Sequence, residues 1–239
     1  MSSITYDGHG LGDHVSAELV EPVAHVIAPE TAQVPGRPGL VLLGGEVDPL
    51  ELRVRLFMDA PDALTVAQRS DVRRTLRAWL LVADGADLVV PGEPSLTWRD
   101  AVCAGVSDWS SLFSEGSAVV TFECMDPIAY GDERSSAAES FEVGGTWPTF
   151  PIVQLVTVAG SSVQLTDSAS GAYVLVERAF ADADAMCMDF SAQTVTVNGE
   201  DATRDVALGS DFFALSPGSA SLAFTGCSSH TVSWTERWA

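Results

Sequence analysis

The stretch TFECMDPIAYGDE, residues 121–133, marks the point at which the character of the chain changes. A strand-like run ends at Asp126-Pro127, where the proline cannot donate a hydrogen bond to a sheet ladder. Asp126 can accept hydrogen bonds from the backbone just beyond it, and Tyr130 can anchor the exiting chain by packing. The stretch is therefore either the start of a polar site or the end of a domain.

The composition beyond this stretch favours a domain boundary. Residues 132–147 are rich in Ser, Glu, Ala and Gly, which is typical of a linker. Short apolar runs separated by turn signals follow, and one of these signals is the hairpin dipeptide Asn198-Gly199. Many short strands at such spacing indicate a β-sandwich. We therefore predict a first domain over 1–131, a linker over 132–147 and a second domain over 148–239.

The first domain is predicted to contain strands and one helix. Apolar and polar residues alternate in EVDPLELRVRLFM, residues 46–58, which indicates a strand with one buried face. Thr65 and Gln68 have the spacing of a capping box, and Gly85 is placed to end the helix. The apolar face of this helix is predicted to comprise Val72, Leu76, Trp79 and Leu80.

The charge and composition exclude several classes of function. The chain has 239 residues, 46% of them hydrophobic, and a net charge of −21, with all twelve cations being arginine. Such a chain repels nucleic-acid phosphates and anionic membranes, so we expect neither sequence-specific DNA binding nor membrane insertion. No apolar run approaches the length needed to span a bilayer, and the N-terminus does not have the pattern of a secretory signal. We therefore expect synthesis and folding in a cytoplasm.

No residue pattern indicates catalysis, and we predict no catalytic, cofactor-binding or metal-binding residues. Asp182, Asp184 and Asp189 lack the glycine and closing glutamate of an EF-hand, and we interpret them as an acidic turn. We expect the four cysteines to be small buried residues rather than metal ligands, although disulfides pairing them in sequence order remain open: Cys103, Cys124, Cys187 and Cys227.

Two sets of residues are candidates for contacts with partners. Arg73, Arg74 and Arg77 lie off the apolar helix face, where they form either a solvated surface or a contact with an acidic neighbouring subunit. In the second domain, Trp147, Trp234 and Trp238 either form a platform for sugars or pack within the fold.

Several motifs in order resemble the siphophage tail component family, the distal tail proteins. In the first domain they are ITYDG (4–8), PGRPG (35–39), RTLRAWL (74–80) and FECMDPIAY (122–130). In the second they are TVTVNG (194–199), SDFFALSPGSASLAF (210–224) and a terminal aromatic-rich strand ending in ERW. The resemblance covers nearly the whole chain, and the order and spacing of the motifs carry it.

The resemblance implies a mainly β protein with two β-sandwich-like domains, the first with one α-helix and the second galectin-like. It further implies a non-enzymatic homohexameric ring at the virion tail tip, assembled in the host cytoplasm. Its expected partners are the tail tube protein, the tail-tip proteins and a receptor-binding protein, and DNA passes through its channel without specific binding.

The resemblance also assigns roles to residues. Asp126, Pro127 and Tyr130 are expected to close the ring-forming domain and to have no catalytic role. Because acidic subunits need cations where they meet, we expect subunit contacts at Arg37, Arg73, Arg74 and Arg77. The alternative function is a carbohydrate-binding module for host-surface glycans, with contacts at Trp147 and Trp234. A hydrolase with paired carboxylates is a more remote alternative.

Overall fold

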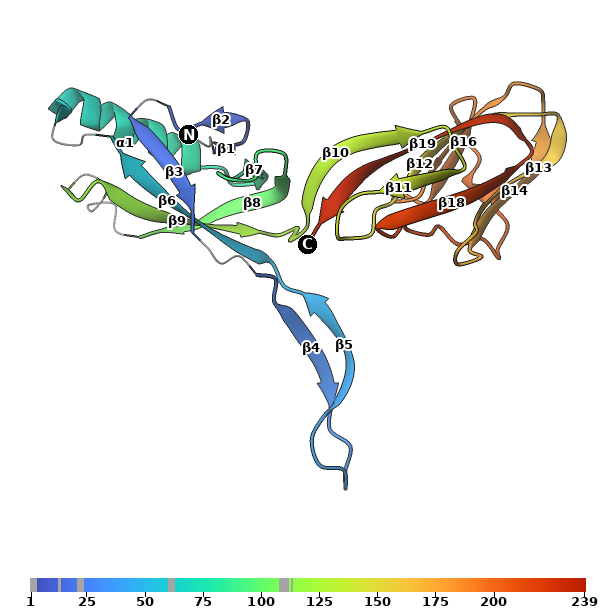
Figure 1. Cartoon of the computed structure of the whole chain (residues 1–239), viewed down its shortest axis with the longest axis horizontal. Helices are drawn as coiled ribbons and strands as arrows, with labels where there is room; N and C mark the ends of the chain where they lie inside the picture. Colours follow the sequence, from blue (N-terminus) through green and yellow to red (C-terminus); the bar gives the residue numbers. More distant parts are fainter. Residues whose placement is uncertain (1–3, 13, 21–23, 60–62, 108–111, 113) are drawn as a thin grey trace. The chain divides into compact units, whose positions relative to one another are not determined.

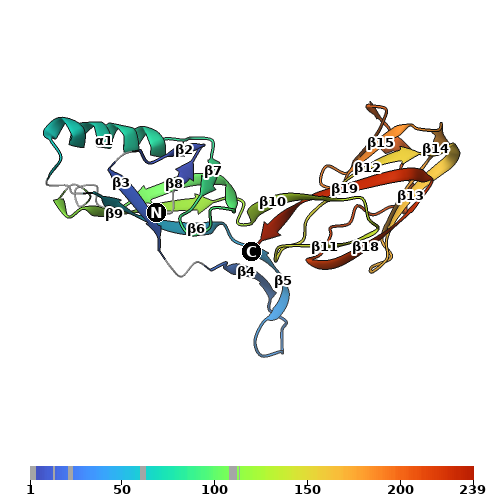
Figure 2. The same ribbon diagram turned by 45° about the horizontal axis from the view of Figure 1, so that its top comes forward.

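The computed structural model divides the chain into two compact units, with the division between Tyr130 and Gly131. Strands predominate and there is one α-helix among the described residues, as predicted (Figures 1 and 2). Residue Ala239 groups with the first unit. The structure describes residues 4–12, 14–20, 24–59, 63–107, 112 and 114–239.

The first unit consists of antiparallel strands and the helix α1. Its elements are β1 (Thr5–Tyr6), β2 (His9–Gly10), β3 (Val15–Leu19), β4 (Ile27–Ala32), β5 (Val41–Val47), β6 (Leu50–Met58), α1 (Val66–Leu80), β7 (Ala86–Val89), β8 (Thr97–Val106), β9 (Ser117–Cys124) and the first residues of β10 (Ala129–Ser136).

The central strands of this unit follow the predicted alternation. Strand β6 pairs with β3 on one side and β9 on the other, and β9 continues to β8, β7, β1 and β2. Every second residue of β6 from Leu50 to Met58 is buried, and the same is true of β9 from Ala118 to Cys124. Because side chains alternate between the faces of a strand, this pattern gives the sheet one apolar face.

Helix α1 covers that face through an aromatic cluster. The rings of Tyr6, Trp79 and Phe122 contact one another edge to face, with centroids 5.1–6.0 Å apart. The predicted capping box is present, because the Thr65 hydroxyl accepts from the Gln68 backbone N–H and the Gln68 side chain accepts from the Thr65 N–H. The helix ends at Leu80 with Leu81 as its cap, so the prediction that Gly85 ends it is wrong.

The second unit is a sandwich of two sheets. Its strands after β10 are β11 (Ser140–Val143), β12 (Ile152–Thr157), β13 (Gly160–Asp167), β14 (Tyr173–Phe180), β15 (Ala185–Asp189), β16 (Thr194–Val197), β17 (Glu200–Asp201), β18 (Gly218–Thr225) and β19 (Cys227–Trp238), with a short 3-10 helix η2 (Thr203–Asp205). One sheet has the order β17-β16-β15-β12-β19-β10, and the other has the order β11-β18-β13-β14. Their inner faces share one apolar core.

The segment predicted as a linker differs from that expectation. Within residues 132–147, β10 continues to Ser136, and β11 pairs with β18 from Ser140 to Val143. Its polar composition arises because much of β10 and β11 is exposed, while Val143 reaches the core. This segment is held in place by hydrogen bonds to strands that are distant along the chain. The composition of the segment does not reveal these bonds.

Candidate functional site

The described residues contain no group of three or more His, Cys, Asp or Glu side chains placed to hold a metal ion. Within the same ranges, no helix has the length and apolar character needed to cross a membrane. Four features stand out: a cationic helix, a cavity beside it, a turn held by hydrogen bonds and a hairpin with exposed apolar residues. All four belong to the first unit.

Helix α1 concentrates positive charge on a strongly acidic chain. It carries four of the twelve arginines and one acid, Asp71, so its net charge is +3. The predicted contact residues Arg73, Arg74 and Arg77 are all exposed, and Arg74 forms an ion pair with Asp71. Such exposed pairs contribute little to stability, so the helix remains available as an electrostatic contact surface.

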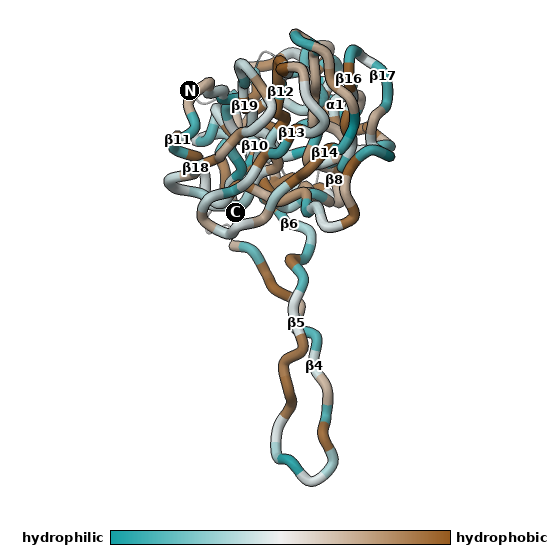
Figure 3. Tube along the Cα trace, turned by 90° about the vertical axis from the view of Figure 1, so that its right-hand side faces the viewer, coloured by the Kyte–Doolittle hydropathy of each residue, from teal (hydrophilic) through white to brown (hydrophobic). Residues whose placement is uncertain are grey.

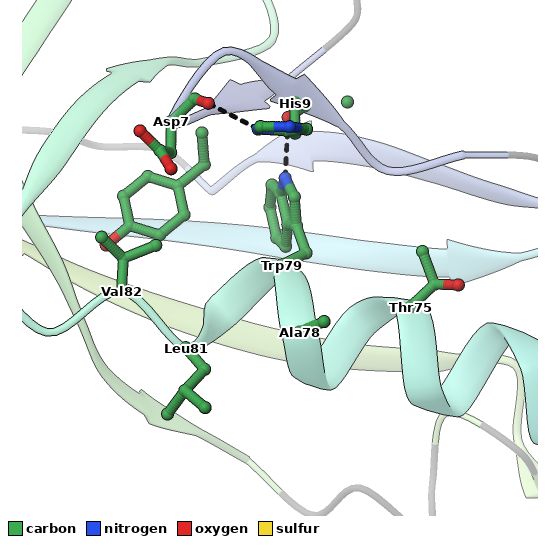
Figure 4. A pocket seen from close by; sticks show the side chains of 9 residues that line it. Asp7, His9, Thr75, Ala78, Trp79, Leu81 and Val82 are labelled. Atoms are coloured by element: carbon green, nitrogen blue, oxygen red, sulfur yellow. Dashed lines mark hydrogen bonds between the residues drawn. The ribbon is translucent and has the colours of Figure 1, made fainter.

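A cavity of about 450 Å³ lies beside the C-terminal end of α1 (Figure 4). The indole Nε1 of Trp79 donates a 2.7 Å hydrogen bond to the carbonyl of His9, which fixes one wall. Leu81 stands at the cavity with 84% of its surface exposed. Its lining residues are Tyr6, Asp7, His9, Gly10, Thr75, Ala78, Trp79, Leu81 and Val82.

The turn that closes the first unit is held by polar contacts. Asp126 accepts from the Ile128 backbone N–H at 3.1 Å and from the Tyr130 hydroxyl at 2.6 Å. The Arg99 guanidinium lies over the Tyr130 ring, 3.7 Å from its centroid. The Pro127 carbonyl accepts a 2.8 Å hydrogen bond from His25 Nε2, which must then carry the proton. These contacts hold the turn at the end of the first unit in place.

A two-stranded hairpin, here called the arm, comprises residues 24–48 with β4, β5 and the loop between them. Neither strand is paired with any other described strand, and the arm extends away from the sheets of its unit (Figure 1). The predicted PGRPG turn forms its tip, with positive φ at Gly36 and Gly39, and Arg37 is exposed there. The structure therefore places Arg37 on the arm and the other three predicted arginines on α1.

Both strands of the arm contain hydrophobic residues (Figure 3). Six side chains are 44–68% exposed: Val26, Ile27, Val34, Leu40, Leu42 and Leu43. The tip was predictable from the sequence, but the strands and the cavity were not. The sequence signal for the two strands was a pair of apolar runs on either side of PGRPG. These runs lack the clear alternation of apolar and polar residues that marks a half-buried strand.

The two tryptophans proposed for glycan contact differ in position. Trp234 is 5% exposed and its ring stacks on Phe141 at 4.7 Å, so it cannot offer a face to a sugar. Trp147 is partly exposed, and its backbone bridges to Arg237. The platform predicted from both residues is therefore not assembled, because Trp234 belongs to the sandwich core.

The cysteines are all free thiols, so neither of the disulfides left open by the sequence is present. Burial, assisted by the nearby charge of Asp126, raises the pKa of Cys124 to about 12. Burial also raises the pKa values of Cys103, Cys187 and Cys227. Thiols that remain protonated are poor nucleophiles and poor metal ligands.

Comparison with known proteins identifies related domains and folds. Residues 144–238 match the family model of the siphovirus-type tail component, C-terminal domain. The crystal structure of phage SPP1 Dit, described as a paradigm of the hub adsorption apparatus in phages that infect Gram-positive bacteria, matches with a TM-score of 0.79 and 18% identity. That match covers 100% of both chains. The comparison with curated proteins finds no match.

Two structures of the phage p2 baseplate in its activated conformation are more distant. The calcium form matches with a TM-score of 0.43 and 8% identity over 92% of this chain and 90% of that chain. The strontium form has the same TM-score and identity over 99% and 98%. Scores this low do not establish a common fold.

The family match and the match to SPP1 Dit agree on the second unit, and the latter extends to the first. Residues 144–238 thus match the siphovirus-type tail component C-terminal domain, and the chain as a whole shares the fold of SPP1 Dit.

Proposed function

We propose that this chain is the distal tail protein of a siphovirus, a structural hub between the tail tube and the tail-tip or baseplate proteins. The observation that carries the proposal is the likeness to SPP1 Dit over the full length of both chains. The tail component domain at residues 144–238 supports it independently, because it rests on sequence. The proposed role is assembly, located at the tail of the virion.

The first unit is proposed to form a homohexameric ring, which requires a surface on each copy that fits a different surface on the next. The charge distribution supports such head-to-tail contacts. Helix α1 has a net charge of +3 within a chain of −21, so it can face an acidic part of a neighbouring copy. Arg73, Arg74 and Arg77 are the residues proposed for this contact.

The ring is proposed to surround a channel through which DNA passes without binding. An excess of acids on the channel wall would repel the phosphates and prevent the genome from adhering. Replacing acids of the wall by arginine should slow DNA ejection, and ejection at the unchanged rate would contradict an acidic wall. The second unit is proposed to contact tail-tip or receptor-binding proteins.

Electron microscopy tests this function at two levels. The purified chain should give rings with sixfold symmetry and a central hole. Virions labelled with an antibody against the chain should carry the label at the end of the tail that is distal to the capsid. Label on the capsid, or its absence from virions that contain a complete tail, would contradict the assignment.

A further inference from the structure

The arm exposes more apolar surface than a solvated hairpin can retain without cost. Of the fourteen large hydrophobic residues with substantial exposure in the described ranges, six lie between Val26 and Leu43. Exposed apolar patches of several hundred Å² mark interaction sites in soluble proteins. A two-stranded hairpin is also only marginally stable alone in water. Both considerations indicate that another surface covers the arm.

The strand register gives the arm two different faces. Ile27 pairs with Val47, and Leu42 pairs with Thr31 beyond a bulge, which places Ile27 and Leu42 on one face. A Cβ on Gly45 would come within 2.7 Å of Ile27 Cγ2, so the Ile27 side chain covers Gly45 on this face.

The opposite face of the arm carries the two acids of its strands. Ala28 pairs with Glu46, and Glu30 pairs with Gly44, so both acids share that side. Burial of the face with Ile27 and Leu42 would leave Glu30 and Glu46 in contact with water. The arm can therefore lie on a surface without burying an unpaired charge.

The cavity at the C-terminal end of α1, here called the Trp79 cavity, has the properties of a receiving surface. Its volume of about 450 Å³ is in the range that accommodates small ligands or several side chains, roughly 300–1,000 Å³. Thr75, Ala78 and Leu81 all line this cavity, and Figure 4 shows them at the C-terminal end of the helix. Arg74 and Arg77 precede Ala78 and Leu81 by four residues, so they lie on the same side of α1. No residue of the arm lines this cavity.

Charge favours a second copy of this chain as the occupant. The arm carries Glu30, Glu46 and Asp48 against Arg37, a net charge of −2, and α1 carries +3. Elsewhere, two copies of a chain with a net charge of −21 repel each other. An arm and a separate receiving surface on one chain form a head-to-tail contact, which closes into a ring when the rotation allows.

We infer that the apolar face of the arm of one copy packs on the Trp79 cavity and helix α1 of the next copy. This inference rests on the proposed ring and names the surfaces that would join its subunits. It predicts that Ile27 and Leu42 are buried in the assembly, close to Ala78 and Leu81 of the adjacent copy.

A matched pair of double variants tests the contribution of the arm. The combination Ile27→Thr with Leu42→Thr removes apolar contacts while keeping residues that favour strands. Its control, Ile152→Thr with Val156→Thr, makes the same kind of change at exposed positions of β12 in the second unit. Sedimentation across a concentration series should show association weakened at least about tenfold by the arm variant. The control should associate like the unsubstituted chain.

A photocrosslinking amino acid at position 42 of the otherwise unchanged chain tests the contact itself. The expected product joins position 42 to the segment 74–82 of a second copy. Crosslinks only to other segments, or only to tail-tube or tail-tip proteins in virions, would overturn the inference.

The outcomes separate the inference from the proposed function. Rings that form equally well with the arm variant overturn the inference alone. A crosslinked pair without rings supports the contact and contradicts a self-assembling ring. The absence of both rings and crosslinks contradicts both.

Discussion

The hydroxyl of Tyr130 donates a 2.6 Å hydrogen bond to Oδ2 of Asp126, which closes the turn at the end of the first unit. The other carboxylate oxygen accepts from the Ile128 N–H, and the Arg99 guanidinium covers the Tyr130 ring. Pro127 joins the same turn to the base of the arm through His25. The turn thus holds the end of the first unit against the base of the arm at His25.

Removing the Tyr130 hydroxyl should destabilise the first unit. We expect Tyr130→Phe to lower the free energy of unfolding by about 1 kcal/mol, because Asp126 loses one hydrogen bond. Tyr130→Leu should cost roughly 0.5–1 kcal/mol more through loss of the arginine contact. Urea unfolding monitored by circular dichroism gives both values.

Tyr173→Phe is the control, because the structure shows no hydrogen bond from that hydroxyl within the described residues. An unchanged urea midpoint for Tyr130→Phe would show that the turn does not depend on this contact.

The hairpin at Asn198 should make the second unit sensitive to acid. Hydrogen bonds from the Asn198 side chain and the Ala181 N–H lower the pKa of Asp184. Since an unfolded aspartate has a pKa of about 3.9, the folded state favours the ionised form. The resulting stabilisation is present above about pH 4 and is lost as the pH falls through the folded pKa.

The test compares urea midpoints of the unsubstituted chain and Asp184→Asn at pH 7 and near pH 3. The variant should be less stable at pH 7, and the difference should shrink in acid. Glu200→Gln removes one charge from the adjacent strand without touching these hydrogen bonds, and serves as control. A difference that stays constant with pH would exclude linkage through Asp184.

Cys124 should resist alkylation while the chain is folded. Its side chain is buried and its pKa is about 12, so almost no thiolate is present at pH 8. Iodoacetamide followed by mass spectrometry should show Cys124 as the slowest of the four thiols, and urea should remove its protection. Rapid labelling of Cys124 in the absence of denaturant would contradict the buried position.

Features set by local chemistry were predictable from the sequence. The capping box of Thr65 and Gln68 depends on residues three apart, and the alternation in β6 follows from one buried sheet face. The Asn198-Gly199 turn was equally accessible, since both residues adopt the positive φ that such dipeptides favour. These signals were sufficient for the fold class.

Features set by distant partners were not predictable in this way. Trp234 is buried because β11 brings Phe141 against it from more than ninety residues away. The segment predicted as a linker becomes strands for the same reason, as β18 supplies hydrogen bonds to β11. The arm lacks a buried face within its own chain, so Leu42 and its neighbours gave no periodic signal.

The native mass of the purified chain, measured at low and moderate salt over a range of concentrations, tests the ring most directly. We predict a species of six times the 25.2 kDa chain mass. Its association should change with salt, since cationic helices meet acidic surfaces. A strict monomer under every condition would contradict a hexameric ring that assembles from this chain alone.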